Sequence, residues 1–136
     1  MAFRFSARSL GNLIGVHPDL VQLMHDALAV VPYDFIVTEG VRSYARQKQL
    51  VKEGKSKTYN SYHLRKSDGY GHAVDICIIP PQGGITWEMR YYLADADVIL
   101  ELAKKRGLKI TWGGDFGTKI HGQGWDCCHF EYKGKV

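Results

Sequence analysis

The spacing of apolar and polar positions predicts a helix near the start of the chain. Apolar residues recur at helical intervals from Leu20 to Val31. Pro18 and Asp19 come just before them, and both residue types suit the first turn of a helix. Pro32 is expected to end the helix, because proline lacks the backbone donor that would continue it.

Two further helices are predicted downstream. Ser43 can cap a helix over residues 44–53, and Gly54 would end it. Thr86 is expected to cap a longer helix over residues 87–106. Gly107 would end this longer helix.

Short apolar runs predict strands at residues 35–38, 73–79, 108–112 and 129–132. A glycine-rich stretch at residues 113–124 is expected to form a loop. Predicted helices lie before the first strand and between later strands, and this order indicates an α+β fold. We expect a small, mainly antiparallel sheet with helices packed on it. With 136 residues, the chain is expected to form a single domain over residues 1–136.

Composition and charge narrow the function only a little. The chain is 45% hydrophobic and 24% charged, as is usual for a globular protein. Its net charge of +4 favours anionic polymers, and nucleic acid and bacterial cell wall are both candidates. The absence of a dense basic stripe with interleaved aromatics disfavours nucleic acid. Cys77, Cys127 and Cys128 do not form a disulfide framework, which favours a reducing cytosol.

The start of the sequence lacks the apolar segment of a signal peptide, and no apolar run approaches the ~20 residues that span a bilayer. We therefore expect no stable membrane association. We also expect a monomer.

Two polar clusters carry the candidate chemistry. Asp75 lies on an otherwise apolar strand, where a carboxylate is costly to bury unless it is paired or binds a metal. Together with His63 and His129 it would supply two imidazoles and a carboxylate, which is a ligand set that catalytic zinc accepts while keeping one position open. Asp126, three residues before His129, is the preferred general base, and Glu131 is either its rival or a residue that orients a ligand.

The remaining histidines are expected to be non-ligating. They are His17, His25, His72 and His121.

These clusters resemble motifs of the VanY-like zinc peptidases. Residues 61–75 resemble the Ser-x-His…Gly-x-Ala-x-Asp signature of that group, and Asp126-x-x-His129 resembles its second motif. Residues 112–116 resemble the loop that leads into the second motif, and residues 38–47 resemble the strand–Arg–helix segment that contacts substrate. The group includes D-alanyl-D-alanine carboxypeptidases and the phage L-alanyl-D-glutamate endopeptidases used as endolysins.

One spacing departs from the family pattern. Eleven residues separate His63 from Asp75, where the family has six. We place the extra residues in a loop within residues 65–70. The strict family spacing would instead select Asp68 as the first ligand, giving a harder, more oxygen-rich site that suits zinc less well.

The resemblance implies a hedgehog/D-Ala-D-Ala-peptidase-like domain that binds Zn²⁺ and cleaves peptidoglycan stem peptides. His63, Asp75 and His129 would be the ligands, Asp126 the proton shuttle, and Arg42 a substrate or oxyanion contact, with Gln47 also binding substrate. An L-alanyl-D-glutamate endopeptidase is preferred to a D-alanyl-D-alanine carboxypeptidase. The implied setting is a phage endolysin in the host cytoplasm that reaches the wall through a holin pore.

Two hypotheses of other classes stay open at this point. A cysteine hydrolase could use Cys127 or Cys128 with His129, although no helix N-terminus follows the thiols to lower their pKa. Alternatively, the chain could be a non-catalytic wall-binding domain. A structural zinc site is usually closed by four protein ligands, which disfavours this reading.

Overall fold

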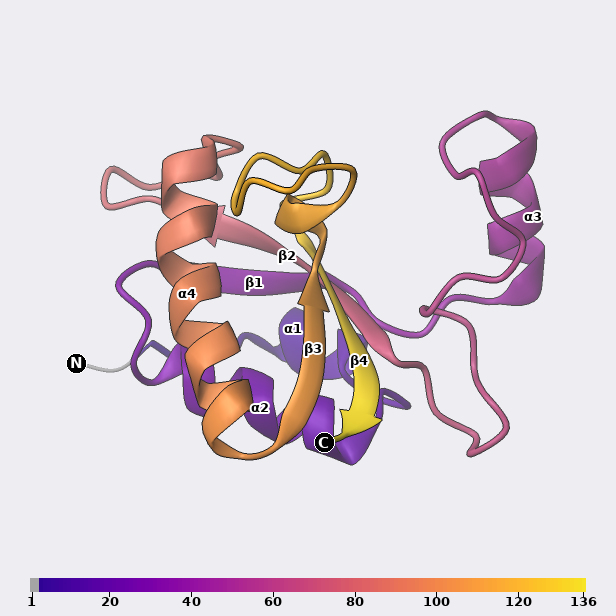
Figure 1. Cartoon of the computed structure of the whole chain (residues 1–136), viewed down its shortest axis with the longest axis horizontal. Helices are drawn as coiled ribbons and strands as arrows, with labels where there is room; N and C mark the ends of the chain where they lie inside the picture. Colours follow the sequence, from indigo (N-terminus) through magenta and orange to yellow (C-terminus); the bar gives the residue numbers. More distant parts are fainter. Residues whose placement is uncertain (1–2) are drawn as a thin grey trace.

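The computed structural model describes residues 3–136 and confirms the α+β class. Figure 1 shows a small sheet with helices on its left and below, and one helix set apart at the far right. The elements in chain order are α1 (Ala7–Asn12), α2 (Pro18–Leu28), β1 (Asp34–Glu39), α3 (Tyr44–Lys52), β2 (Ala73–Ile79), α4 (Met89–Lys105), β3 (Leu108–Trp112), the short 3-10 turn η1 (Gly113–Asp115) and β4 (His129–Lys135).

The four strands form one sheet in the order β1-β2-β4-β3, and each neighbouring pair is antiparallel. In the register of β2 and β4, Asp75 lies opposite His129 and Ala73 lies opposite Glu131. Directly opposed residues point to the same face of a sheet. The pairing therefore places the polar side chains of both strands together.

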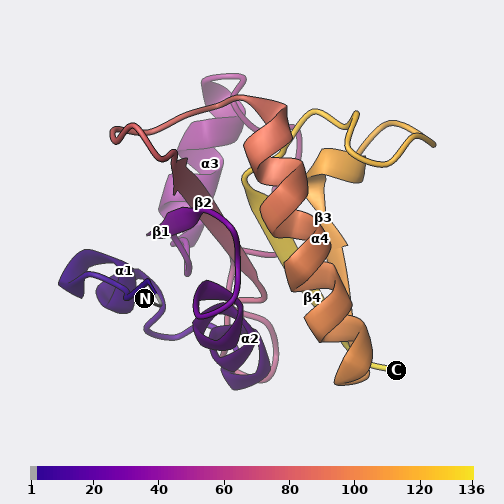
Figure 2. The ribbon, with the colours of Figure 1, turned by 90° about the vertical axis from the view of Figure 1, so that its left-hand side faces the viewer.

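Alternation along the strands separates the core from the site. Val74 and Ile76 of β2 and Phe130 of β4 are fully buried and belong to the core that α2 and α4 cover. Their neighbours Asp75 and His129 point to the other face. Figure 2 shows α2 and α4 together at the sheet, with α3 away from both.

The ends of two helices differ from the prediction. α2 ends at Leu28, three residues before the predicted end at Val31. The backbone N–H groups of Val30 and Val31 both donate to Ala27 O at 2.9 Å, which forms a turn after the helix. α4 begins at Met89 and not at residue 87, so the predicted capping role of Thr86 was wrong. The Thr86 hydroxyl instead accepts from the Glu88 N–H and forms a turn before the helix.

Two features were missed or underestimated. α1 has only six residues, too few for a helical pattern to be recognised. β4 continues to Lys135, because β3 pairs with it as far as Leu108 opposite Lys135. The predicted cap Ser43 is confirmed, since its hydroxyl accepts from the Arg46 N–H at 3.0 Å.

Candidate metal centre

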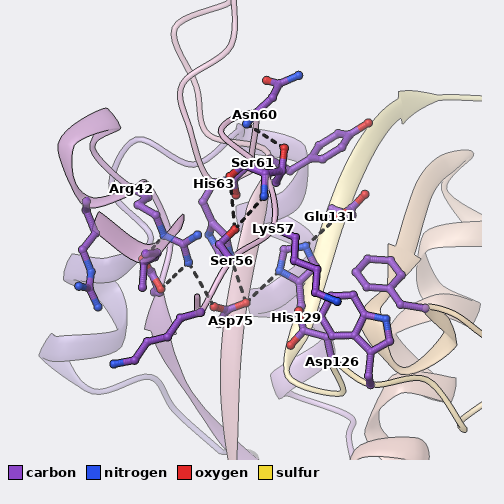
Figure 3. Close-up of a pocket in the computed structure, with 18 of the residues that line it drawn as sticks. Arg42, Ser56, Lys57, Asn60, Ser61, His63, Asp75, Asp126, His129 and Glu131 are labelled. Atoms are coloured by element: carbon purple, nitrogen blue, oxygen red, sulfur yellow. Dashed lines mark hydrogen bonds and ion pairs between the residues drawn. The ribbon is translucent and has the colours of Figure 1, made fainter. Parts of the chain in front are cut away.

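The three predicted ligands converge at one point. His63, Asp75 and His129 each offer one ligand atom, and these atoms all lie within 4.8 Å of one another. Asp75 Oδ1 is 3.2 Å from His63 Nε2 and 3.0 Å from His129 Nδ1. Figure 3 shows both rings facing the Asp75 carboxylate at the floor of a cleft. The structure thus brings together residues far apart in the sequence.

Local hydrogen bonds fix the orientation of His63. Its side chain is buried, and its Nδ1 lies 2.7 Å from Gly40 O. A carbonyl can only accept, so Nδ1 carries the proton and Nε2 presents its lone pair to Asp75. The Ser61 hydroxyl accepts from the His63 N–H at 3.1 Å, which accounts for the serine two residues before the histidine in the motif.

The carbonyl that orients His63 is itself placed by α1. Asn12, at the end of α1, donates from Nδ2 to Val37 O at 2.9 Å, so this helix is tied to β1. Gly40 passes so close to the Asn12 carbonyl that a side chain on it would collide with the backbone. The missed helix therefore supports the site from behind.

His129 is oriented by a carboxylate on its own strand. Its Nε2 donates to Glu131 Oε1 at 2.8 Å, while Nδ1 faces Asp75. Glu131 Oε2 lies 3.5 Å from Lys133 Nζ. This arrangement resembles the carboxylate–histidine support found behind many metal ligands. This contact favours the orienting role for Glu131, although its side chain also lines the cleft.

The protonation of these groups reflects their crowding. Burial alone would lower the pKa of His129, but hydrogen bonds to Asp75 and Glu131 outweigh it and raise the pKa to about 9. Burial would likewise raise the pKa of Asp75, and the two histidines instead hold it far below its usual range. The centre thus strongly favours positive charge beside the carboxylate.

The donor set fits a zinc ion. Each ring uses one nitrogen as a donor to protein, so the two nitrogens that face Asp75 present lone pairs when the rings are neutral. Two lone pairs and a carboxylate oxygen directed at one point repel one another unless a cation lies between them. Two imidazoles and one carboxylate match the three-ligand set of catalytic zinc.

The extra residues between the first two ligands form a closed turn. Arg65 and Gly71 pair across it, and Lys66 donates from its N–H to Tyr70 O at 2.9 Å. The insertion therefore bulges outward, as predicted, and leaves His63 beside Asp75. Asp68 lies in this turn, where its carboxylate is 2.7 Å from His72 Nε2, and it is not part of the ligand group.

The other histidines have separate partners. His17 caps α2, His25 stacks edge-on against Phe5, and His121 bridges the carboxylates of Asp97 and Asp115.

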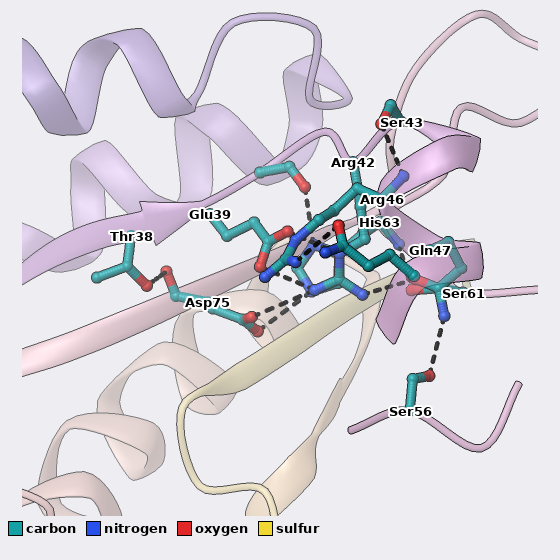
Figure 4. Close-up of polar contacts among 12 residues, drawn as sticks. Thr38, Glu39, Arg42, Ser43, Arg46, Gln47, Ser56, Ser61, His63 and Asp75 are labelled. Carbon is teal, nitrogen blue, oxygen red and sulfur yellow. Dashed lines mark hydrogen bonds and ion pairs between the residues drawn. The ribbon is translucent and has the colours of Figure 1, made fainter. Parts of the chain in front are cut away.

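Arg42 lies beside the centre and is held by a carboxylate. Its Nε and Nη2 donate to the two oxygens of Glu39 at 2.6 and 2.8 Å, and Nη2 is 3.9 Å from Asp75 Oδ2 (Figure 4). β1 has a bulge between Val37 and Glu39. In regular pairing Thr38 would lie opposite Asp75, but the bulge shifts the register by one residue, so Glu39 takes that position. The bulge thus aims Glu39 at the site face. Sequence reasoning missed Glu39, because a bulge leaves no clear mark in a short strand.

Gln47 does not reach the cleft. Its side chain is fully buried on α3, and its Oε1 accepts from Arg42 Nη1 at 2.8 Å. Its Nε2 donates to Ser56 Oγ and Thr58 O at 2.9 and 2.6 Å. The prediction that Gln47 touches substrate is therefore corrected: it positions Arg42 and the loop after α3 (Figure 4).

Asp126 lines the same cleft as the three ligands, on the wall formed by the loop before β4. Gly113 passes against the Asp126 backbone with no room for a side chain, and its carbonyl accepts from the Asp126 N–H at 3.0 Å. The cleft has a volume of about 700 Å³. Phe116 and the exposed Trp125 form part of the same wall, with ring centroids 5.4 Å apart.

The cysteines do not form a nucleophilic site. Burial raises the pKa of Cys127, and it raises that of Cys128 far above the usual range. A thiol needs a lowered pKa to act as a nucleophile near neutral pH. The geometry thus disfavours the cysteine-hydrolase hypothesis.

Comparisons with known proteins identify the class. The family model described as phage L-alanyl-D-glutamate peptidase matches residues 1–132, so the chain belongs to this family. The chain is 28% identical over 122 residues to the L-alanyl-D-glutamate peptidase of Escherichia phage T5, with 87% of this chain and 85% of that protein covered. These matches confirm the family resemblance inferred from the motifs.

Two bacterial proteins are also similar. The peptidoglycan L-alanyl-D-glutamate endopeptidase CwlK of Bacillus subtilis strain 168 is 33% identical over 119 residues, which cover 74% of this chain and 66% of that protein. The crystal structure of the Serratia marcescens L-Ala D-Glu endopeptidase ChiX superposes with a TM-score of 0.81 at 39% identity, over 97% of this chain and 91% of that one. The predicted fold is thereby confirmed.

Proposed function

We propose that this chain is a zinc-dependent peptidoglycan peptidase that cleaves the bond between L-Ala and D-Glu of the stem peptide. The observation that carries the proposal is the convergence of His63, Asp75 and His129 at the floor of an open cleft. All three direct one potential ligand atom to the same point, and the cleft leaves room for a peptide on the remaining side. Relatives of the same family bear the name of this activity.

When bound, zinc supplies Lewis-acid polarisation of the scissile carbonyl and makes an attacking water more acidic. Asp126, in the wall of the cleft, accepts the proton of that water and returns it to the nitrogen of the leaving D-Glu. His129 keeps its metal-facing nitrogen directed at the site because Glu131 holds the other one.

Arg42 stabilises negative charge that develops on the scissile carbonyl oxygen. Its guanidinium is clamped by Glu39 and Gln47, so it is fixed in position before the substrate arrives. A charge that is already in position stabilises the transition state more effectively, because no free energy is spent on reorganising it during the reaction.

The substrate implies a bacterial cell wall as the partner, and the phage relative suggests host lysis as the setting. Release from the host cytoplasm through a holin pore and action as a monomer belong to this proposal. No helix within residues 3–136 combines the length and apolar character needed to cross a bilayer.

Digestion of purified peptidoglycan, followed by mass spectrometry, tests the proposal. Zinc-loaded protein should create new N-terminal D-Glu, lose activity with a chelator and regain it on zinc addition. Asp126→Asn should lower kcat by roughly 10²–10⁴-fold with unchanged zinc content. Release of D-Ala would indicate the carboxypeptidase alternative. Binding to the wall without products would indicate a non-catalytic domain.

A further inference from the structure

The cleft contains a lysine that the mechanism above does not use. Lys57 lines the cleft from the loop that follows α3. Figure 3 shows its side chain extending across the cleft toward the wall that carries Asp126 and His129. Within residues 3–136, no carboxylate forms an ion pair with Lys57, and its ammonium donates no hydrogen bond to protein.

The other cations that line the cleft are engaged. Arg42 is held by the two-point contact with Glu39, and the mechanism above already assigns it to the scissile carbonyl oxygen. Lys55 Nζ lies 3.7 Å from Glu53, and Arg46 donates to Gln49 on its own helix at 3.4 Å. Among the cations of the cleft lining, Lys57 thus has neither a carboxylate partner nor a side-chain hydrogen bond within residues 3–136, and its charge can meet an incoming anion.

The backbone on both sides of Lys57 is anchored. Gln47 Nε2 donates to Ser56 Oγ and to Thr58 O, the residues directly before and after the lysine. The Ser56 N–H also donates to Leu50 O near the end of α3 at 3.1 Å. Because Gln47 accepts from Arg42 as well, a single buried amide sets the positions of both cations. Lys57 is thus presented from a fixed loop, which lowers the ordering cost of binding.

The proposed substrate carries an anion close to the scissile bond. In the stem peptide the chain continues from the γ-carboxyl of D-Glu, so the α-carboxyl is free. This carboxylate is attached to the carbon that bears the scissile nitrogen. It distinguishes an L-Ala–D-Glu bond from an ordinary peptide bond, and a cation in the lining of the cleft can pair with it. A lysine ammonium can meet it as a mobile point charge.

We infer that Lys57 binds the free α-carboxylate of D-Glu and makes the enzyme prefer it to an uncharged amide at the same position. This assignment rests on the proposed function. It identifies a residue that selects the substrate.

Two synthetic peptides containing L-Ala–D-Glu test the inference, one with the free α-carboxylate and one with the α-amide (D-isoglutamine). The measurement is kcat/KM of zinc-loaded protein on each. The wild type should prefer the acid by about tenfold, the effect of one charge-assisted hydrogen bond. Lys57→Met should bring the ratio of acid to amide close to one, and Lys57→Arg should restore most of the preference.

Lys52→Met is the matched control, because it removes the same charge from an exposed position of α3 outside the cleft lining. It should keep the wild-type ratio. The role of Lys57 would be overturned if the wild type cleaved both peptides equally well, or if Lys57→Met kept the preference for the acid. In either case, cleavage of the L-Ala–D-Glu bond would still uphold the proposed function. Failure of the wild type to cleave either peptide would overturn the proposed function and the assignment with it.

Discussion

Zinc binding at pH 7 should displace about one proton from His129. In the metal-free protein the pKa of this side chain is about 9, because Asp75 and Glu131 hydrogen-bond to its two nitrogens and outweigh the effect of burial. The ring is therefore protonated at neutral pH. A metal can use His129 Nδ1 only after that proton has left.

The size of the effect follows from the difference between pH and pKa. The pKa of His129, about 9, lies about two units above pH 7, so proton competition weakens zinc binding at pH 7 by about 100-fold, or about 3 kcal/mol. Apparent zinc affinity should rise about tenfold per pH unit from pH 7 to pH 9 and level off above that. Glu131→Gln should lower the pH at which the apparent zinc affinity levels off. On that plateau the variant should bind zinc about 10–100-fold more weakly than the wild type.

Calorimetry in two buffers of different ionisation enthalpy measures the protons released at pH 7, and competition with a chelator gives the affinity at each pH. Glu101→Gln, on an exposed position of α4, is the control for charge and should behave as the wild type. Release of less than about half a proton, or an affinity that is flat between pH 7 and 9, would refute the reasoning from the pKa of His129.

Three further outcomes are expected. The raised pKa of His129 adds to the free energy of unfolding of the metal-free protein, and this contribution is complete below pH 6.5. At most about 3 kcal/mol of it is lost as the pH rises from 6.5 to 9. Urea unfolding should show this loss without zinc and not with zinc present. Gln47→Leu should lower the free energy of unfolding by about 1–3 kcal/mol, because the buried partners of Gln47 lose their hydrogen bonds, and it should also lower kcat/KM. Gln49→Leu, at an exposed position of the same helix, should change neither quantity. Gly40→Ala should cost about 1–3 kcal/mol in denaturant unfolding, through the collision with the Asn12 carbonyl, and an unchanged midpoint would contradict the close approach.

The convergence of the three candidate ligands could be predicted because each leaves a local signal in the sequence. Asp75 interrupts an apolar strand, and alternation along β2 and β4 sends it and His129 to one face. Ser61 two residues before His63 then marks the turn that presents the first histidine. The strands themselves were predictable for the same reason, since short-range alternation determines which side chains enter the core.

The supporting residues could not be predicted, because they depend on distant parts of the chain. Gln47 is buried by a loop that follows its own helix, and the motif resemblance that suggested contact with substrate does not register that loop. Glu39 reaches the site only through a bulge. The role of Gly40 depends on α1, a helix too short to have been recognised.

The closed turn between the first two ligands has a practical consequence. Arg65 and Gly71 pair at its base, so the chain leaves and re-enters the domain at nearly the same place whatever lies between them. The pairing at the base lets the number of residues between the first two ligands differ from the family spacing while His63 stays beside Asp75. The exposed tip of this turn is a natural place to insert a fluorescent tag or a wall-binding module.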